Sequence, residues 1–309
     1  MEHTAVCTLF EGHYHYGLGA LVNSLCRHGF RSVVWAGYRG SLPPWATPLS
    51  TREGYQEFSV GEGCVIRFIA LQPDVHFANY KPDFMLRLFE ENPDLPGLLY
   101  FDPDIVIRCR WSFFEEWIEC GIALVQDITN GTMPSNHPLR MQWISFATAW
   151  GYRTRNALDQ YFNSGFLGLT RQQASCLHIW QDLLARLPTL KLDMRQFMPG
   201  DRSQPFFAID QDTLNMTAMF TEHPLSTIGP EGMDFVPGGF TMSHAVGSPK
   251  PWNKHMIAHS LDGRRPSPAD HAYLLNATTP IRLYSDTELA LKRLCLRCAA
   301  AIGRLWNRS

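Results

Sequence analysis

Two acidic residues separated by a single position follow an apolar run in the first half of the sequence. Leu98–Phe101 is typical of a buried strand, and Asp102 and Asp104 come directly after it. Residues two apart in an extended segment point to the same side, so both carboxylates can bind one cation. Hard divalent cations prefer such oxygen ligands and also bind diphosphate oxygens. Acidic pairs are common at exposed turns as well, and the buried-type strand before this pair is what favours a binding site.

A second polar stretch, residues 244–252, has the sequence His-Ala-Val-Gly-Ser-Pro-Lys-Pro-Trp. His244 can complete a metal site through a ring nitrogen. Gly247 allows the backbone to approach a phosphate closely, and Lys250 supplies a positive charge for phosphate oxygens. A single histidine near a lysine usually lies on the surface without a binding role, whereas the whole nine-residue pattern favours a metal and phosphate site.

Two further stretches combine polar residues with predicted regular structure. Residues 162–165 are Phe-Asn-Ser-Gly within an apolar run over 161–169, which predicts a strand. Residues 210–215 are Asp-Gln-Asp-Thr-Leu-Asn and open a predicted helix over 210–220, where carboxylates suit the positive end of the helix dipole. Each also has a plain structural interpretation, a bulge in the strand and an ordinary acidic helix start.

The elements that must position these residues alternate between strands and helices. Apolar runs predict strands over Thr4–Phe10 and Ser32–Ala36, with a helix over Gly17–Arg27 between them. A β-α-β opening implies a parallel sheet. Another predicted strand, Ile122–Gln126, ends at Asp127. The alternation predicts an α/β domain with long functional loops.

Composition excludes several classes of protein. The 309 residues carry a net charge of −2 and are 45% hydrophobic, so the chain is neither disordered nor basic enough for a nucleic-acid partner. Spanning a membrane takes about 18 or more consecutive apolar residues, and no such run is present. The first residues lack a secretory signal pattern, and the eight cysteines are scattered. We therefore expect a cytoplasmic protein with reduced thiols.

The last 25 residues, 285–309, have a different character, with five basic and two acidic side chains. At about 100° per residue, apolar side chains share one helix face, arginines lie opposite, and Trp306 stands near the end. That apolar stripe consists of Leu291, Leu294, Cys295, Cys298, Ile302 and Leu305. Such a basic amphipathic helix either contacts an anionic membrane surface peripherally or packs on the domain with its basic face in water.

Taken in chain order, the four motifs resemble family 8 of the glycosyltransferases, a retaining A-type group that includes bacterial lipooligosaccharide galactosyltransferases and glycogenin. The resemblance covers about residues 4–255, and the histidine-to-tryptophan motif at 244–252 is its most specific part. It implies a single Rossmann-like GT-A domain, residues 1–260, with a mixed, mostly parallel sheet. Residues 261–309 would form a C-terminal extension that contains the amphipathic helix.

The resemblance also implies roles for individual residues. Asp102, Asp104 and His244 would hold Mn²⁺ or Mg²⁺ against the diphosphate of a UDP-sugar donor, and Gly247 and Lys250 would hold the phosphates. Other residues would contact the donor or the acceptor. They are Glu11 and Tyr14 at the nucleobase, Lys81 at the donor, Asn163, Asp210 and Gln211 at the sugar, and Asp127 at the sugar or acceptor. The family usually has Asp and Asn-Tyr where this chain has Glu11 and His13-Tyr14.

The expected reaction transfers a hexose to a glycan, a lipid-linked saccharide or another hydroxyl acceptor, in surface polysaccharide or lipopolysaccharide synthesis. The acceptor hydroxyl would attack from the leaving-group face, and Gln211 would have a positioning role or stabilise the oxocarbenium-like state. A double displacement through a carboxylate such as Asp210 is the alternative mechanism. Two other functions are considered. A sugar nucleotidyltransferase usually has a basic Gly-rich loop after the first strand, and residues 11–17 contain no Lys or Arg. A non-catalytic carbohydrate-binding protein would have no need of an intact metal set.

Overall fold

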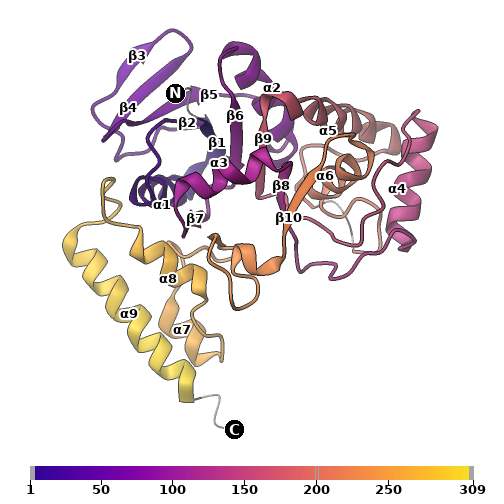
Figure 1. Ribbon diagram of the computed structural model, residues 1–309. Coiled ribbons are helices and arrows are strands. Elements are labelled where there is room, and N and C mark those ends of the chain that lie inside the picture. The colour runs from indigo at the N-terminus through magenta and orange to yellow at the C-terminus, as the bar shows by residue number, and fades with distance from the viewer. Residues whose placement is uncertain (1–3, 199, 201, 306–309) are drawn as a thin grey trace. The chain divides into compact units, whose positions relative to one another are not determined.

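The computed structural model describes residues 4–198, 200 and 202–305 (Figure 1). The chain forms two compact units, each assembled from segments that are separate in sequence. The first unit consists of Met1–Leu9, Ala70–Phe101 and Ser112–Pro230, and the second of Phe10–Ile69, Asp102–Trp111 and Glu231–Ser309.

The first unit is built on strands in the order β10, β8, β9, β6, β1. They are β1 (Ala5–Glu11, which ends in the second unit), β6 (Gly97–Phe101), β8 (Ile122–Val125), β9 (Phe166–Thr170) and β10 (Leu225–Ile228). β1 is parallel to β6 and β8 is parallel to β10, whereas β9 is antiparallel to β6 and β8, so all of these strands except β9 run in the same direction. Every residue of β6 and β8 is buried, which explains why they are continuous apolar runs in the sequence.

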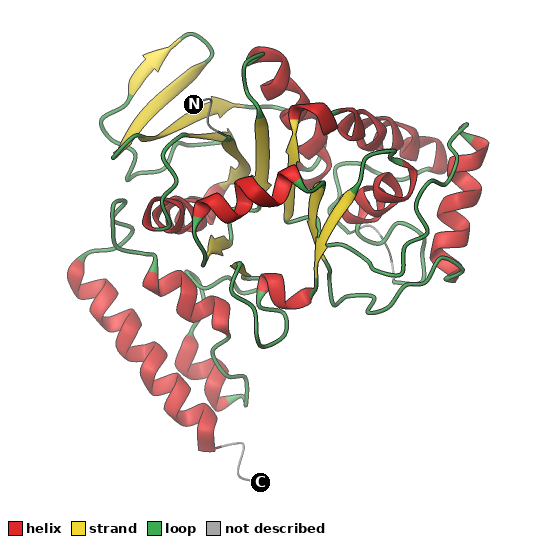
Figure 2. Cartoon of the chain, viewed as in Figure 1, coloured by secondary structure: helices red, strands yellow, loops and turns green. Residues whose placement is uncertain are grey.

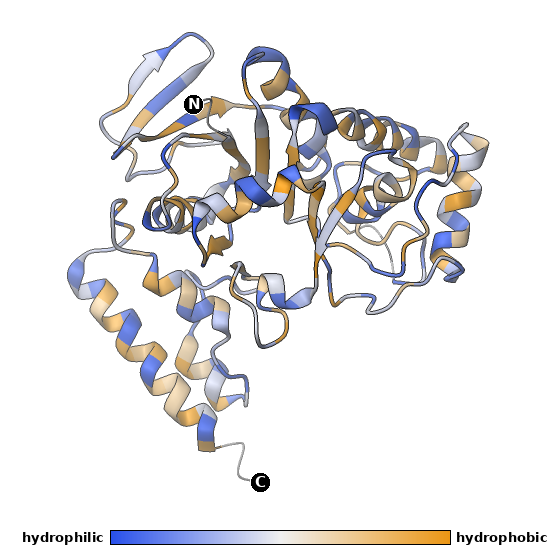
Figure 3. Ribbon diagram, viewed as in Figure 1, coloured by the Kyte–Doolittle hydropathy of each residue, from blue (hydrophilic) through white to orange (hydrophobic). Residues whose placement is uncertain are grey.

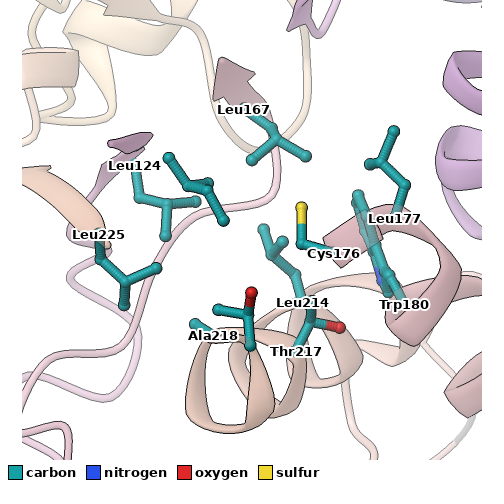
Figure 4. Close-up of a pocket in the computed structure, with 11 residues that line it drawn as sticks. Leu124, Leu167, Cys176, Leu177, Trp180, Leu214, Thr217, Ala218 and Leu225 are labelled. Carbon is teal, nitrogen blue, oxygen red and sulfur yellow. The ribbon is translucent and has the colours of Figure 1, made fainter. Parts of the chain in front are cut away.

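The helices of this unit pack on the sheet or on one another (Figure 2). They are α2 (Lys81–Glu91), α3 (Trp111–Glu119, whose first residue belongs to the second unit), α4 (Pro138–Ala149), α5 (Ser175–Arg186) and α6 (Ile209–Phe220), with 3₁₀ turns at Phe77–Tyr80, Arg171–Gln173 and Leu187–Leu190. Helix α6 packs on α5 and is buried along its whole length. Figure 4 shows Cys176 and Trp180 of α5 and Leu214 of α6, which line one apolar pocket with Leu124 and Leu225 of the sheet. The apolar cavity among these side chains measures only about 10 Å³, so close packing fixes the position of α6.

The second unit contains two sets of strands. In the first set β2 (Val33–Arg39) neighbours β5 (Cys64–Ala70), and β4 (Tyr55–Gly61) and β3 (Ser50–Arg52) follow as an antiparallel hairpin. The second set is a two-stranded antiparallel ribbon of β7 (Ile105–Ile107) and β11 (Met242–His244). The helices are α1 (His15–Arg27), α7 (Met256–Leu261), α8 (Pro268–Leu275) and α9 (Asp286–Leu305), with 3₁₀ turns at Gly12–Tyr14 and Pro230–Met233. The predicted α/β class, with a mixed and mostly parallel sheet and a C-terminal helix, is confirmed.

Helix α9 packs against α7 and α8, but not through the predicted apolar stripe. Its buried residues are Leu289, Leu296, Ala299 and Gly303. At Gly303 a Cβ would lie 2.7 Å from the Arg265 side chain, so glycine permits the close approach. Hydrophobic periodicity gives little weight to alanine and glycine, which is why the stripe was chosen instead. Trp306 lies outside the described residues.

Leu291 and Leu294 of the predicted stripe are instead 60% and 56% exposed. Figure 3 shows apolar and polar residues alternating along α9. None of the helices in the described ranges is both long and apolar enough to cross a membrane.

Other local predictions need correction. The hairpin β3–β4 and helix α4 were not predicted, because their apolar residues follow neither period clearly. The strand expected over 161–169 begins only at Phe166, so the Phe-Asn-Ser-Gly motif lies in the segment just before β9. The helix expected over 210–220 is confirmed as α6.

Candidate active site

The predicted site residues fall into two sets, one in each unit. The second unit contains Glu11, Tyr14, Asp102, Asp104, His244, Gly247 and Lys250, and the first contains Lys81, Asp127, Asn163, Asp210 and Gln211.

The β7–β11 ribbon brings the acidic pair and the histidine motif together. His244 is the register partner of Ile105, the residue directly after Asp104. The Ala245 backbone N–H donates to the Asp104 carbonyl oxygen at 3.0 Å, which extends the pairing by one residue beyond the ribbon. Motifs that are far apart in sequence are therefore joined by backbone hydrogen bonds.

Asp102, Asp104 and His244 form a cluster whose potential ligand atoms all lie within 4.8 Å of one another. His244 Nε2 lies 3.3 Å from an Asp104 carboxylate oxygen and 3.9 Å from an Asp102 oxygen. Two carboxylates and one imidazole nitrogen suit Mn²⁺ or Mg²⁺, so the residues fit such a cation. His244 Nδ1 is buried and has no hydrogen-bond partner among the described residues. The nitrogen that faces the two carboxylates is Nε2, as the distances show.

Lys250 completes the charge balance of this cluster. Its Nζ lies 2.5 Å from the second Asp104 oxygen and donates to the Ala245 carbonyl at 2.8 Å. Burial alone would raise the pKa of Asp104, but the neighbouring His244 and Lys250 side chains outweigh burial and lower that pKa. Burial would likewise lower the pKa of Lys250, and the Asp104 carboxylate raises it. Asp104 is therefore ionised and Lys250 protonated at neutral pH.

Aromatic rings and a glycine pack the loop around Lys250. The Tyr14 ring centroid lies 5.8 Å from Lys250 Nζ and 5.3 Å from the Trp252 ring, which it meets edge-on. Gly247 has a φ of +78°, a left-handed conformation that explains glycine at this position of the motif. Tyr14, predicted from the loop after the first strand, thus lies beside the predicted phosphate residues.

Gly17 of α1 is a site-supporting residue that sequence reasoning missed. A Cβ at this position would lie 2.3 Å from the Pro103 carbonyl oxygen and 2.9 Å from the Trp252 ring. The helix therefore touches the corner between Asp102 and Asp104 and also the end of the histidine motif. The predicted helix over Gly17–Arg27 begins at this residue, where a glycine needs no special explanation, so the sequence carried no signal for the contact.

Glu11 forms a separate contact at the end of β1. One of its carboxylate oxygens accepts a hydrogen bond from Arg39 Nε at 2.8 Å and lies 2.8 Å from Arg39 Nη2 in an ion pair. The Glu11 side chain is 43% exposed. The structure thus pairs the predicted nucleobase contact with an arginine of β2.

The set in the first unit is a continuous hydrogen-bonded chain of buried side chains. At one end, Lys81 Nζ lies 2.9 Å from an Asp210 oxygen and donates to the Ser164 carbonyl at 2.9 Å. The Ser164 hydroxyl donates to the same Asp210 oxygen at 2.6 Å. Burial would raise the pKa of Asp210, but the charge of Lys81 and the Ser164 hydrogen bond lower it. Asp210 is therefore an ion-paired carboxylate.

The chain continues through the amide of Gln211. Its Oε1 accepts from the Ser164 backbone N–H at 3.1 Å, and its Nε2 donates to Asp127 at 3.3 Å. Asn163 Nδ2 donates to the same Asp127 oxygen, while Asn163 Oδ1 accepts from the Gly165 N–H at 2.8 Å. The structure therefore brings Asp127, Asn163, Asp210, Gln211 and Lys81 together in one hydrogen-bonded chain.

Two residues of α6 that were not assigned a role support this chain. Asn215 exchanges two hydrogen bonds with the Phe162 backbone, donating at 2.9 Å and accepting at 2.8 Å. Asp212 accepts from the Tyr161 hydroxyl at 2.7 Å and from the Ala208 N–H at 2.9 Å. Burial raises the pKa of Asp212 to about 8. The motif at 210–215 thus fixes the segment before β9 in addition to supplying Asp210 and Gln211.

Comparison with solved structures identifies similar folds. The glycosyltransferase GlyE from Streptococcus pneumoniae TIGR4 is 14% identical, with a TM-score of 0.54, over 96% of this chain and 63% of GlyE. The bifunctional glycosyltransferase WbbM is 17% identical, with a TM-score of 0.52, over 94% of this chain and 52% of WbbM. The chain thus spans between half and two thirds of the length of these two proteins, and it shares a glycosyltransferase fold with them. No protein-family model and no curated protein sequence matches it.

Proposed function

We propose that the protein is a metal-dependent glycosyltransferase that moves a hexose from a UDP-sugar to a saccharide or lipid-linked saccharide. The observation that carries this proposal is the Asp102–Asp104–His244 cluster with Lys250 beside it. A divalent cation and a lysine at one point suit a diphosphate leaving group. The similarity in fold to two glycosyltransferases supports the same function.

Within this proposal, the residues of the second unit act on the nucleotide diphosphate. A bound Mn²⁺ or Mg²⁺ would neutralise charge that grows on the departing diphosphate. Lys250 is held by Asp104, by the Ala245 carbonyl and by the Tyr14 hydroxyl, and its positive charge faces the position proposed for the phosphate oxygens. Gly247 offers its backbone to the phosphates, and Glu11 and Tyr14 contact the nucleobase.

The residues of the first unit are assigned to the sugar. Lys81 and Asn163 bind the donor, and Asp127 orients the sugar or the acceptor. Gln211 stabilises the oxocarbenium-like state through its amide. Asp210 is ion-paired with Lys81 and hydrogen-bonded to Ser164, and both contacts reduce its nucleophilicity. This favours direct attack by the acceptor hydroxyl from the leaving-group face, with retention, and with proton transfer to the leaving phosphate oxygen. It disfavours a covalent intermediate on Asp210.

Donor hydrolysis tests the proposal. The protein is incubated with UDP-, GDP-, ADP- and CMP-sugars, with Mn²⁺ or with EDTA, and released nucleotide is quantified. We expect Mn²⁺-dependent release from a UDP-sugar, reduced at least about 100-fold in Asp104→Ala because a metal ligand is lost. Asp94→Ala, which changes an exposed aspartate, serves as the matched control. Calorimetry that detects no nucleotide binding with or without metal would refute the proposal.

We further propose that the enzyme works at the cytoplasmic face of a membrane, in surface polysaccharide or lipopolysaccharide synthesis. Residues 1–260 would form the transferase domain and residues 261–309 its extension. The basic side chains of α9 and its exposed leucines support peripheral membrane contact. Vesicle sedimentation with and without anionic lipid measures this contact.

A further inference from the structure

Two adjoining hollows lie on the C-terminal part of the second unit, and of the residues assigned above to the donor only Gly247 lines one of them. One is basic and lies behind the loop of residues 246–249, and the other is an apolar groove beside α7, α8 and α9. Lys254 and Met256 line both of them. A single ligand with two chemically different ends can therefore occupy both hollows.

The basic hollow has a volume of about 250 Å³. The side chains of Lys254, His259, Arg264 and Arg265 line it, and no acidic residue is among its lining residues. Arg265 uses Nε to hold the Gly303 carbonyl at 2.7 Å, which leaves its terminal N–H groups. Arg264 pairs with Asp262 at 3.2 Å, but both side chains are more than 60% exposed, so this ion pair is weak. The hollow suits a phosphate group.

Lys254 is held in place at the boundary between the hollows. Its Nζ donates to both oxygens of the fully buried Asp270, each at 2.8 Å. Asp270 also caps the first turn of α8 through Ser267. The position of the lysine is therefore fixed by the fold, although most of its charge is balanced by Asp270.

The apolar groove has a volume of about 490 Å³, within the range of small-molecule sites. Aliphatic side chains from all three helices line it, among them Ile257 and Leu261 of α7, Leu274 of α8 and Leu291 of α9. Leu261 and Leu291 are 57% and 60% exposed, which is unusual for two leucines that share one surface. The groove suits an aliphatic chain.

We propose that the two hollows together bind a phosphorylated lipid, with its phosphate in the basic hollow and its chain in the groove. This inference rests on the proposed function, because it assigns the ligand as the lipid anchor of the acceptor. The basic residues of the first hollow favour a phosphate over an uncharged headgroup. Because Lys254 and Met256 line both hollows, one amphiphilic ligand fits them better than two separate ligands. Each methylene that enters the groove contributes about a fourfold gain in affinity.

The test measures binding of soluble alkyl phosphates to the full chain by calorimetry, below their micelle concentration. Hexyl, octyl and decyl phosphate are compared with inorganic phosphate and with uncharged decyl glucoside. We expect saturable binding that strengthens with chain length, and at least about 100-fold weaker binding of inorganic phosphate. Leu291→Asp and Arg264→Glu should each weaken decyl phosphate at least about tenfold.

Matched control variants distinguish a specific binding site from nonspecific adsorption to the surface. Leu294→Asp changes an equally exposed leucine of α9 that does not line the groove, and Arg297→Glu changes an exposed arginine outside the basic hollow. Both should bind decyl phosphate within twofold of the parent protein. Equal losses in Leu291→Asp and Leu294→Asp, or equal binding of decyl glucoside, would overturn the site and leave general membrane adsorption.

Nucleotide binding distinguishes failure of this inference from failure of the proposed function. UDP with Mn²⁺ is titrated into the parent protein and into Leu291→Asp. If UDP binds both equally while decyl phosphate binds neither, the lipid site is wrong and the transferase proposal is unaffected. If decyl phosphate binds and is lost in Leu291→Asp but no nucleotide binds, the lipid site stands and its assignment to an acceptor is overturned.

Discussion

Replacing Gly17 by alanine perturbs the candidate metal site from a helix that contributes no ligand. The new Cβ would lie 2.3 Å from the Pro103 carbonyl oxygen, a backbone atom between the two aspartates. Ordinary contacts begin near 3.4 Å, so the corner or the helix must move by about 1 Å. The same Cβ would lie 2.9 Å from the Trp252 ring, so this ring limits how far the helix can shift to relieve the contact.

The expected size of the effect follows from overpacking. Forcing a methyl group into a close-packed contact costs about 1–3 kcal/mol. If the corner that carries Asp102 and Asp104 absorbs this strain, Mn²⁺ affinity should fall by about 5- to 150-fold. The gain in helix propensity from alanine, about 1 kcal/mol, acts on the stability of the helix and not on the ligands.

Gly19→Ala is the matched control on the same helix. Its Cβ would lie 2.4 Å from Leu283 Cδ2, a side-chain methyl that can move by changing rotamer. Mn²⁺ binding is measured from the electron paramagnetic resonance signal of the free ion, with and without UDP, and circular dichroism checks folding. Equal Mn²⁺ affinity in the two folded variants would refute the argument that α1 sets the metal-site geometry.

Two further predictions concern the buried chain of the first unit. Lys81→Met leaves Asp210 as an unpaired buried charge, so the free energy of unfolding should fall by about 3–5 kcal/mol, and Lys81→Met/Asp210→Asn should recover most of it. Chemical denaturation measures both, and an additive loss in the double variant would contradict the ion pair. Because the folded-state pKa of Asp212, about 8, lies above its ordinary value near 3.9, the stability that this group contributes is complete below about pH 4 and is lost as pH rises toward 8. The free energy of unfolding of Asp212→Asn, relative to that of the parent protein, should therefore rise by about 1 kcal/mol per pH unit from pH 5.5 to 7.5. A difference between the two free energies that does not change with pH would show that Asp212 is ionised throughout.

The sequence predicts the α/β class, the mostly parallel sheet and the C-terminal helix, but not the hairpin β3–β4 or helix α4. Asp102, Asp104 and His244 could be grouped because their motifs resemble, in chain order, those of family 8 of the glycosyltransferases, and the structure brings the three side chains together. The contact of Gly17 with Pro103 could not be predicted, since it depends on where a helix crosses a loop distant in sequence. The predicted packing face of α9 was wrong for a related reason. Ala299 and Gly303 are buried in that face because they are small, and not because they are hydrophobic.

Each set of candidate site residues is assembled by elements of its own unit, and this has a consequence for experiment. The metal-type cluster depends on the backbone pairing of β7 with β11 and on α1, whereas the buried chain depends on α6 and the segment before β9. Loss of Mn²⁺ binding in Asp104→Ala therefore need not be accompanied by loss of the Lys81–Asp210 ion pair. A variant such as Lys81→Met that destabilises the first unit and still binds Mn²⁺ would separate folding effects from effects on the metal, because no residue of the buried chain is a ligand in the cluster.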